Sequence, residues 1–317
     1  MSNNQNKYRA LCEVETSIPI FSQAWWLDAT AGKGSWDVAL VEKGNLIVAA
    51  MPYVRRNRIG FIMLGQPALT QTLGPWFRET DAKCSTKLAQ HNDWLQKLIG
   101  QLPPFAHFTQ NWNWKIDNWL PFYWAGFQET TRYTYILHEL CDQVSLWQGL
   151  QENIRGDIKK ASKRFNLRVR EDLVVDEFLV LNHMTFARQN MKMPYTDAFV
   201  HKLDQACAER HARKIFIAED DKGRRHAGVY VVWDENSAYY LMGGGDPELR
   251  NSGATSLCMW EAIKFAATVT RRFDFEGSMI KSVEKFFRAF GAQQTPYFTI
   301  SKTPSRLLKT VLFLRSL

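Results

Sequence analysis

Apolar and polar residues alternate along two stretches of the chain, one in each half. Residues 36–54 alternate on both sides of a Lys-Gly turn, and residues 214–233 do the same around a second Lys-Gly turn. Period-two patterning on either side of a glycine-bearing turn predicts a β-hairpin. A short apolar run follows each hairpin, at 61–64 and at 238–242, so a third strand is expected in each half.

Two further matches extend this similarity between the halves. The segment GQPAL at 65–69 corresponds to GDPEL at 245–249, and GFQET at 126–130 corresponds to GAQQT at 291–295. Because the matches occur in the same order, they predict a tandem duplication of one α/β unit. Two unrelated domains with coincidental turns are the alternative interpretation.

The length of 317 residues suits two domains, which we place at 1–138 and 139–303, followed by a helical tail at 304–317. The second half indicates an α/β fold with a mixed sheet, in which helices precede a meander and a strand-helix-strand segment follows it. Its expected elements are a basic helix at 144–165, a strand at 167–170, helices at 174–191 and 195–213, the meander at 214–243, a helix at 252–270, a strand at 272–276, a helix at 282–290 and a strand at 297–301.

Charge and cysteine usage narrow the class of protein. The net charge is +8 and the pI is about 9.2, which favours an anionic partner such as a phosphate-bearing cofactor, a nucleotide sugar or RNA. The five cysteines are scattered, which is typical of reduced thiols in a cytoplasmic protein, and no His or Cys spacing suggests a metal site. The polar start does not resemble a signal peptide, and no apolar run is long enough to predict an integral membrane segment.

The most distinctive local chemistry lies where the third strand of the second half leads into a helix. Residues 239–255 pass from a strand through three consecutive glycines to a helix start, with Asn251 and Ser252 as possible caps. Free N–H groups at a helix N-terminus favour phosphate. The segment matches neither a P-loop nor a dinucleotide fingerprint. A purely structural turn is the competing interpretation.

This order of elements resembles the GNAT N-acyltransferase fold, and the chain as a whole resembles the Fem-like branch, which carries two GNAT-like domains. The loop Arg250-Asn251-Ser252-Gly253-Ala254-Thr255 resembles the superfamily's Gln/Arg-x-x-Gly-x-Gly/Ala loop, whose amides hold the pyrophosphate of coenzyme A, although Thr255 replaces the usual Gly or Ala. The segments 274–278 and 284–291 are similar to the closing part of Fem-like proteins, and FSQAWWL at 21–27 and LGPW at 73–76 are also typical of them.

The resemblance implies direct attack of an amine on an acyl donor, without a covalent enzyme intermediate. Acetyl-CoA or another acyl-CoA is then the co-substrate, and no metal is required. Glu276 at the end of the expected strand is the preferred proton acceptor, with Asp274 second, while Tyr240 would orient the acceptor or donate a proton to the leaving thiolate. Each of these side chains also has a structural interpretation, as a cap, an ion-pair partner or a core tyrosine.

The acceptor side is expected to involve Arg155 and Lys159, which lie on one stripe of a basic helix, together with Gln189, Tyr195 and Ser278. A solvated helix face is the alternative for the basic stripe. The first copy lacks a basic residue where the second has Arg250, so it is expected to be degenerate, with one active site in the second copy.

The expected activity is therefore transfer of an acyl group from acyl-CoA to an amine of an amino sugar, a nucleotide sugar or a cell-envelope precursor. An aminoacyl-tRNA-dependent transfer that builds peptide cross-bridges is the first alternative, with tRNA as a partner. A non-catalytic binding or scaffold protein is the second. No DNA partner is expected.

Overall fold

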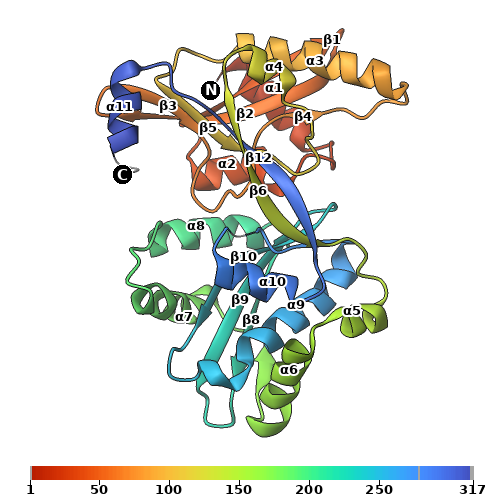
Figure 1. The fold of residues 1–317 in the computed structure, drawn as a ribbon, viewed down its shortest axis with the longest axis vertical. Coiled ribbons are helices and arrows are strands. Elements are labelled where there is room, and N and C mark those ends of the chain that lie inside the picture. The colour runs from red at the N-terminus through yellow and green to blue at the C-terminus, as the bar shows by residue number, and fades with distance from the viewer. Residues whose placement is uncertain (1, 278, 315–317) are drawn as a thin grey trace. The chain divides into compact units, whose positions relative to one another are not determined.

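The computed structural model describes residues 2–277 and 279–314, which divide into two compact units. The first comprises Met1–Arg132 together with Pro296–Leu317, and the second comprises Tyr133–Thr295 (Figure 1). The first change of unit thus lies six residues before the expected boundary. The expected tail at 304–317 groups with the first unit, where it contributes the helix α11 (Arg306–Leu314).

The first unit is built on a meander followed by a parallel strand. Strands β1 (Trp36–Lys43), β2 (Leu46–Arg58) and β3 (Phe61–Gly65) are successively antiparallel, and β3 pairs in parallel with β5 (His107–Asn111). The end of β12 (Gln293–Lys302) pairs with β5, and short β4 (Trp76–Phe77) pairs with β2. The remaining elements are α1 (Asn3–Cys12), η1 (Ile20–Ser22), α2 (Ala24–Thr30), α3 (Cys84–Gly100), α4 (Leu120–Trp124) and the start of β6 (Gln128–Leu137).

The second unit repeats this plan with β8 (Arg213–Glu219), β9 (Arg225–Trp233) and β10 (Ala238–Gly245) as the meander and β11 (Phe273–Asp274) as the parallel strand. Short β7 (Arg168–Arg170) pairs with β8, and the end of β6 pairs with β11. The helical elements are α5 (Gln143–Gly149), α6 (Glu152–Arg164), α7 (Val175–Arg188), α8 (Asp197–Ala208), η2 (Arg250–Ser252), α9 (Ala254–Val269) and α10 (Lys281–Arg288). The expected hairpins and third strands are therefore present in both halves.

Helices cover both faces of the second unit's sheet. On one face, residues of α6, α9 and α10 form a continuous core with alternate residues of β8 and β9. On the other face, Phe178 of α7 packs on Tyr230 of β9 with ring centroids 5.8 Å apart, and Asp204 of α8 accepts a 2.7 Å hydrogen bond from the Tyr230 hydroxyl. Burial on both faces explains why β9 is apolar over nearly its whole length.

The expected single helix at 144–165 is wrong, because the structure has two helices separated at Leu150 and Gln151. Leu150 is extended, and the Gln151 N–H donates to the carbonyl of Ala289 instead of continuing the helix. Arg155 donates to the carbonyls of Gln148 and Leu150. These contacts come from distant parts of the chain and from the first turns of α6, so the break is a tertiary effect that helical periodicity does not show.

The strand expected at 272–276 is also shorter than expected and ends at Asp274. Glu276 and Gly277 both have a left-handed backbone, with φ of 64° and 63°. A Cβ on Gly277 would lie 2.2 Å from the carbonyl oxygen of Tyr133. The chain therefore turns sharply here, and only glycine fits the second position of the turn.

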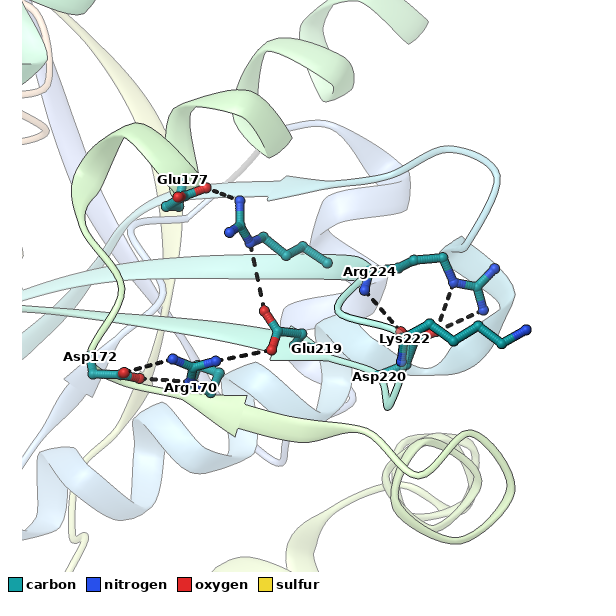
Figure 2. A network of polar contacts seen from close by, with 8 residues as sticks. Arg170, Asp172, Glu177, Glu219, Asp220, Lys222 and Arg224 are labelled. Atoms are coloured by element: carbon teal, nitrogen blue, oxygen red, sulfur yellow. Dashed lines mark hydrogen bonds and ion pairs between the residues drawn. The ribbon is translucent and has the colours of Figure 1, made fainter.

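A polar network ties the start of α7 to the hairpin end of β8 and β9 (Figure 2). Arg170 pairs with Asp172 at 2.7 Å and with Glu219 at 3.0 Å, and Arg225 joins Glu219 to Glu177 on α7. Each exposed ion pair contributes only about 0–1 kcal/mol to the free energy of unfolding. The main effect of this network is therefore to fix the position of α7 over the sheet.

Candidate functional site

Strands β10 and β11 separate immediately after they pair, and a pocket lies where they part. They are paired only at Ala238↔Phe273 and Tyr239↔Asp274, whereas β10 continues to Gly245. The pocket has a volume of about 330 Å³. It lies wholly within the second unit, between the end of α7, the glycine-rich end of β10, the start of α9 and one side of α10. The lining residues are Thr185, Arg188, Gln189, His226, Tyr240, Gly243, Gly244, Gly245, Asp246, Arg250, Ala254, Thr255, Ser282, Val283, Phe286 and Phe287.

The rim of this pocket carries the N-terminus of α9 and an arginine. Arg250 and Thr255 are exposed and, with Ala254, line the pocket. Among the described residues no side chain caps α9, so its first-turn N–H groups are available to a ligand. The helix dipole and the guanidinium together make this end of the pocket suitable for a phosphate group.

The other residues of the expected phosphate loop lie away from the pocket. Gly253 has φ of 81°, and a Cβ there would lie 2.3 Å from the carbonyl oxygen of Asp157, so this glycine allows α9 to approach α6. Ser252 is buried, with a hydroxyl that has no partner among the described residues, and Asn251 is exposed. Of the six residues from 250 to 255, three line the pocket: Arg250, Ala254 and Thr255.

Tyr240 lies at the inner part of the pocket. Its ring packs edge-on against Phe287 of α10 with centroids 5.7 Å apart, and its hydroxyl lies 1.8 Å from where a Cβ on Gly243 would be. Burial raises the pKa of Tyr240 above its ordinary value, so the phenol stays protonated at neutral pH. It can therefore donate a hydrogen bond to a developing negative charge.

Helix α7 holds the edge of β10 that faces the parted strands. Asn182 donates a 2.7 Å hydrogen bond to the carbonyl of Gly243, and Thr185 accepts a 2.9 Å hydrogen bond from the Gly245 N–H. The Tyr195 hydroxyl donates in turn to the Asn182 side chain at 3.1 Å. We call Asn182 and Thr185 the α7 clip. It occupies backbone groups that a ligand lying along β10 would otherwise use.

Asp274 and Glu276 are not among the residues that line the pocket. Phe273 and Phe275 pack into the core beside α10, and Asp274 instead accepts hydrogen bonds from the Thr134 hydroxyl and, at 2.8 Å, from the Glu276 N–H. Burial raises the pKa of Asp274 to about 6. Burial, then the charges of Asp274 and Asp234, raise the pKa of the half-buried Glu276 well above its ordinary value.

The expected acceptor residues are dispersed. Gln189 lines the pocket at the end of α7, whereas Tyr195 is not a lining residue and is linked through Asn182 to the carbonyl of Gly243. Arg155 is occupied by the carbonyls between α5 and α6, whereas Lys159 is exposed on α6. Ser278 lies outside the described residues.

Two further residues line the pocket, and the second of them, His226, was not predicted from the sequence. Arg188 lines the pocket from the last turn of α7. His226 is buried, its Nε2 lies 3.3 Å from Asp220, and its Nδ1 has no partner among the described residues. His226 is the extra residue of a bulge opposite the end of β8, and a polar residue at the start of an otherwise apolar strand was the available signal.

Comparison with known proteins places the pocket in a family context. Residues 149–288 match the family model described as an acetyltransferase (GNAT) domain. Over residues 149–288 the second unit is therefore similar to GNAT acetyltransferase domains, and we call this part the GNAT domain below. The match lies within the second unit and contains every residue that lines the pocket. A search of curated protein sequences found no match.

Solved structures extend the likeness to the full chain. FemX has a TM-score of 0.69 at 10% identity, with 98% of each chain covered. The C-terminal domain of a putative lysylphosphatidylglycerol synthetase from Agrobacterium fabrum has a TM-score of 0.59 at 11% identity, covering 98% of this chain and 96% of that one. A tandem GNAT protein from the clavulanic acid biosynthesis pathway has a TM-score of 0.53 at 12% identity, covering 94% and 92%. The chain therefore has the fold of Fem-like, tandem-GNAT proteins.

None of the described helices combines the length and the apolar character needed to cross a membrane. Within the same residues, no group of three or more His, Cys, Asp or Glu side chains is arranged to hold a metal ion.

Proposed function

We propose that the GNAT domain transfers an acyl group from acyl-CoA to the amine of a small acceptor, such as an amino sugar, a nucleotide sugar or a cell-envelope precursor. The observation that supports this most directly is the pocket between the parted strands. It combines a protonated phenol, Tyr240, with an uncapped helix N-terminus and Arg250 at the rim. An acyl-CoA molecule that binds with its phosphates at the N-terminus of α9 would extend its thioester carbonyl toward Tyr240.

In this reaction the acceptor nitrogen attacks the thioester carbonyl carbon, so a C–N bond forms and the C–S bond breaks. The Tyr240 hydroxyl donates a hydrogen bond to the departing thiolate, which takes up one proton from solvent and leaves as the free thiol. The ammonium group loses one proton. We retain Glu276 as the candidate acceptor of this proton, because a carboxylate whose pKa is raised binds a proton more tightly, and Asp274 as the second candidate. Neither lines the pocket, so a water molecule must link the acid to the amine.

Arg188 and Gln189 belong to the end of α7 and reach the pocket from the opposite face of the sheet to α10. We assign them, together with Tyr195 as a positioning residue acting through Asn182, to the acceptor side. Lys159 remains a candidate for acceptor phosphates or carboxylates. Arg155 is a weaker candidate, because its guanidinium already bonds two backbone carbonyls.

An aminoacyl-tRNA donor is the second candidate, and the α7 clip favours it. Asn182 and Thr185 occupy groups of Gly243 and Gly245 with which the amides of a pantetheine arm would pair. An aminoacyl ester has no such arm, and the net charge of +8 suits RNA. A non-catalytic binding protein is the remaining alternative.

Ligand-induced thermal stabilisation distinguishes these candidates. For an acyl-CoA enzyme, acetyl-CoA raises the melting temperature of the full chain, and Arg250→Ala reduces the shift, whereas Arg168→Ala, an exposed arginine on β7, leaves it unchanged. Glu276→Gln is expected to keep the shift and lose acyl transfer. Salt-dependent stabilisation by tRNA without a response to acetyl-CoA would replace the first proposal by the second. No response to either ligand would support a binding protein.

A further inference from the structure

The positive charge of this chain is concentrated in the first unit. Residues 1–132 and 296–317 contain 17 basic and 10 acidic residues, a net charge of +7, whereas residues 133–295 contain 23 and 22, a net charge of +1. The second unit, which contains the GNAT domain, is thus nearly neutral. Electrostatic attraction of an anionic partner therefore comes mainly from the first unit.

The turn between β2 and β3 has a sequence that is unfavourable for a two-residue hairpin turn. Ile59 and Gly60 are the two central residues between paired Arg58 and Phe61, and both have positive φ, 50° and 79°. Such two-residue turns favour Asn-Gly, because a β-branched residue is strained in the left-handed region. Ile59 is also 96% exposed. The turn therefore holds an apolar side chain in water at a cost in backbone strain.

Three basic residues precede this exposed isoleucine on the same strand. Arg55, Arg56 and Arg58 are exposed on the last residues of β2. In the described part of the chain, Arg56 and Arg58 have no acidic partner. They line one side of a groove of about 320 Å³ on the sheet face, whose other side includes His107 and Thr109 of β5.

Helix α11 starts beside the same groove. The Thr303 hydroxyl is 2.8 Å from His107 Nδ1, and α11 begins three residues later (Figure 1). Leu307 and Leu314 are 67% and 64% exposed, and Val311 between them is 39% exposed. These positions are spaced as i, i+4 and i+7, so they form one apolar stripe on the helix, which also exposes Arg306 and Lys309.

We propose that the first unit docks on an anionic membrane surface through the β2–β3 turn and α11. Ile59 and the α11 stripe would enter the boundary between headgroups and acyl chains, while Arg56 and Arg58 bind lipid phosphates. RNA would use the same charges, but the most exposed apolar side chains described on this surface, Ile59, Leu307 and Leu314, are aliphatic and do not offer a base a ring to stack on. The combination of strained, exposed isoleucine and unpaired arginines therefore favours lipid.

The test is co-sedimentation of the full chain with vesicles of phosphatidylglycerol and phosphatidylcholine, compared with phosphatidylcholine alone. We expect binding to the anionic vesicles only. Ile59→Asn creates the Asn-Gly turn that the backbone prefers, so it should raise the melting temperature while lowering vesicle affinity roughly tenfold. Because the variant is expected to be more stable, unfolding cannot explain its loss of binding.

Charge is tested separately. Arg56→Gln combined with Arg58→Gln should lower vesicle affinity roughly thirtyfold. Two arginines near an anionic surface contribute about equally to the binding free energy, and both contributions are lost. The matched control, Arg168→Gln with Lys222→Gln, removes two exposed charges from the second unit and should bind as the unmodified chain does.

Four results would overturn the proposal: equal binding to neutral vesicles, no binding to either kind, wild-type affinity of Ile59→Asn, or loss of binding in the control. Binding of tRNA that needs Arg56 and Arg58 but not Ile59, without vesicle binding, would identify the surface as an RNA site. A dimer in solution that Leu307→Ser with Leu314→Ser dissociates, again without vesicle binding, would mean that the apolar stripe of α11 is covered by a second copy.

Discussion

The Tyr240 hydroxyl lies directly over Gly243, where a side chain would be, so substitution of Gly243 by alanine should displace the Tyr240 ring. The added Cβ would lie 1.8 Å from the Tyr240 hydroxyl oxygen and 2.9 Å from Cζ. An ordinary contact needs 3.4 Å, so the hydroxyl must move by roughly 1.6 Å. Phe287 packs against the same ring, which limits its freedom to withdraw.

Overpacking of this kind costs about 2 kcal/mol in unfolding free energy. Removing the hydroxyl by Tyr240→Phe costs less than about 1 kcal/mol alone, because the phenol has no partner to lose among the described residues. In the double variant the main clash is gone, so about 1 kcal/mol of the loss should be recovered. Gly245→Ala is the control, since its Cβ would meet its nearest neighbour at 3.4 Å.

The measurement is equilibrium urea unfolding of the four members of the cycle, followed by far-UV circular dichroism. Binding of acetyl-CoA is recorded on the same samples, and Gly243→Ala should weaken it because the displaced phenol enters the pocket. Strict additivity of the two substitutions would refute the contact. Equal destabilisation by Gly245→Ala would show that any side chain in this strand is harmful, whatever Tyr240 does.

Three other substitutions give clear expectations. Gly253→Ala should cost about 3 kcal/mol, combining left-handed strain with a clash against α6, whereas Gly223→Ala, which has a similar φ but open space, should cost only about 1 kcal/mol in the same unfolding assay. The pKa of Asp274 is about 6 when folded, so the unfolded chain releases this proton first as the pH rises. This group should therefore lower stability by up to about 3 kcal/mol between pH 4 and 7, a slope that Asp274→Asn removes in pH-dependent melting. Asn182→Ala leaves a carbonyl of β10 unpaired and should cost about 2 kcal/mol, with faster hydrogen exchange along that strand; unchanged exchange would mean that the α7 clip does not secure it.

Elements defined by local periodicity could be predicted from the sequence. The hairpins and third strands followed from period-two alternation and glycine-bearing turns, and they are present in both units. The start of α9 followed from the glycine-rich segment and the GNAT resemblance. These features depend on residues close together in the chain, so a sequence pattern contains the necessary information.

Features that depend on distant contacts could not be predicted. Alternation correctly separated Asp274 from the aromatic residues beside it, but it could not show that the pocket lies on the aromatic side. In the sequence, Asn182 is one polar position in an apolar helix. Its hydrogen bond to the Gly243 carbonyl exists only because α7 packs against β10 in the folded chain. Arg155 formed part of a basic stripe by spacing, yet its guanidinium is used to cap α5. In each case the partner lies outside the local pattern.

The order in which the two units appear along the chain has a consequence for how the protein is assembled. The second unit is contained in one continuous stretch, whereas the first needs Pro296–Leu317 to add a strand to β5. A ribosome therefore releases all of the GNAT domain before the unit that begins the chain can be completed. Deletion of residues 296–317 would remove the strand that pairs with β5, so it is expected to damage the first unit while leaving the residues of the GNAT domain in place.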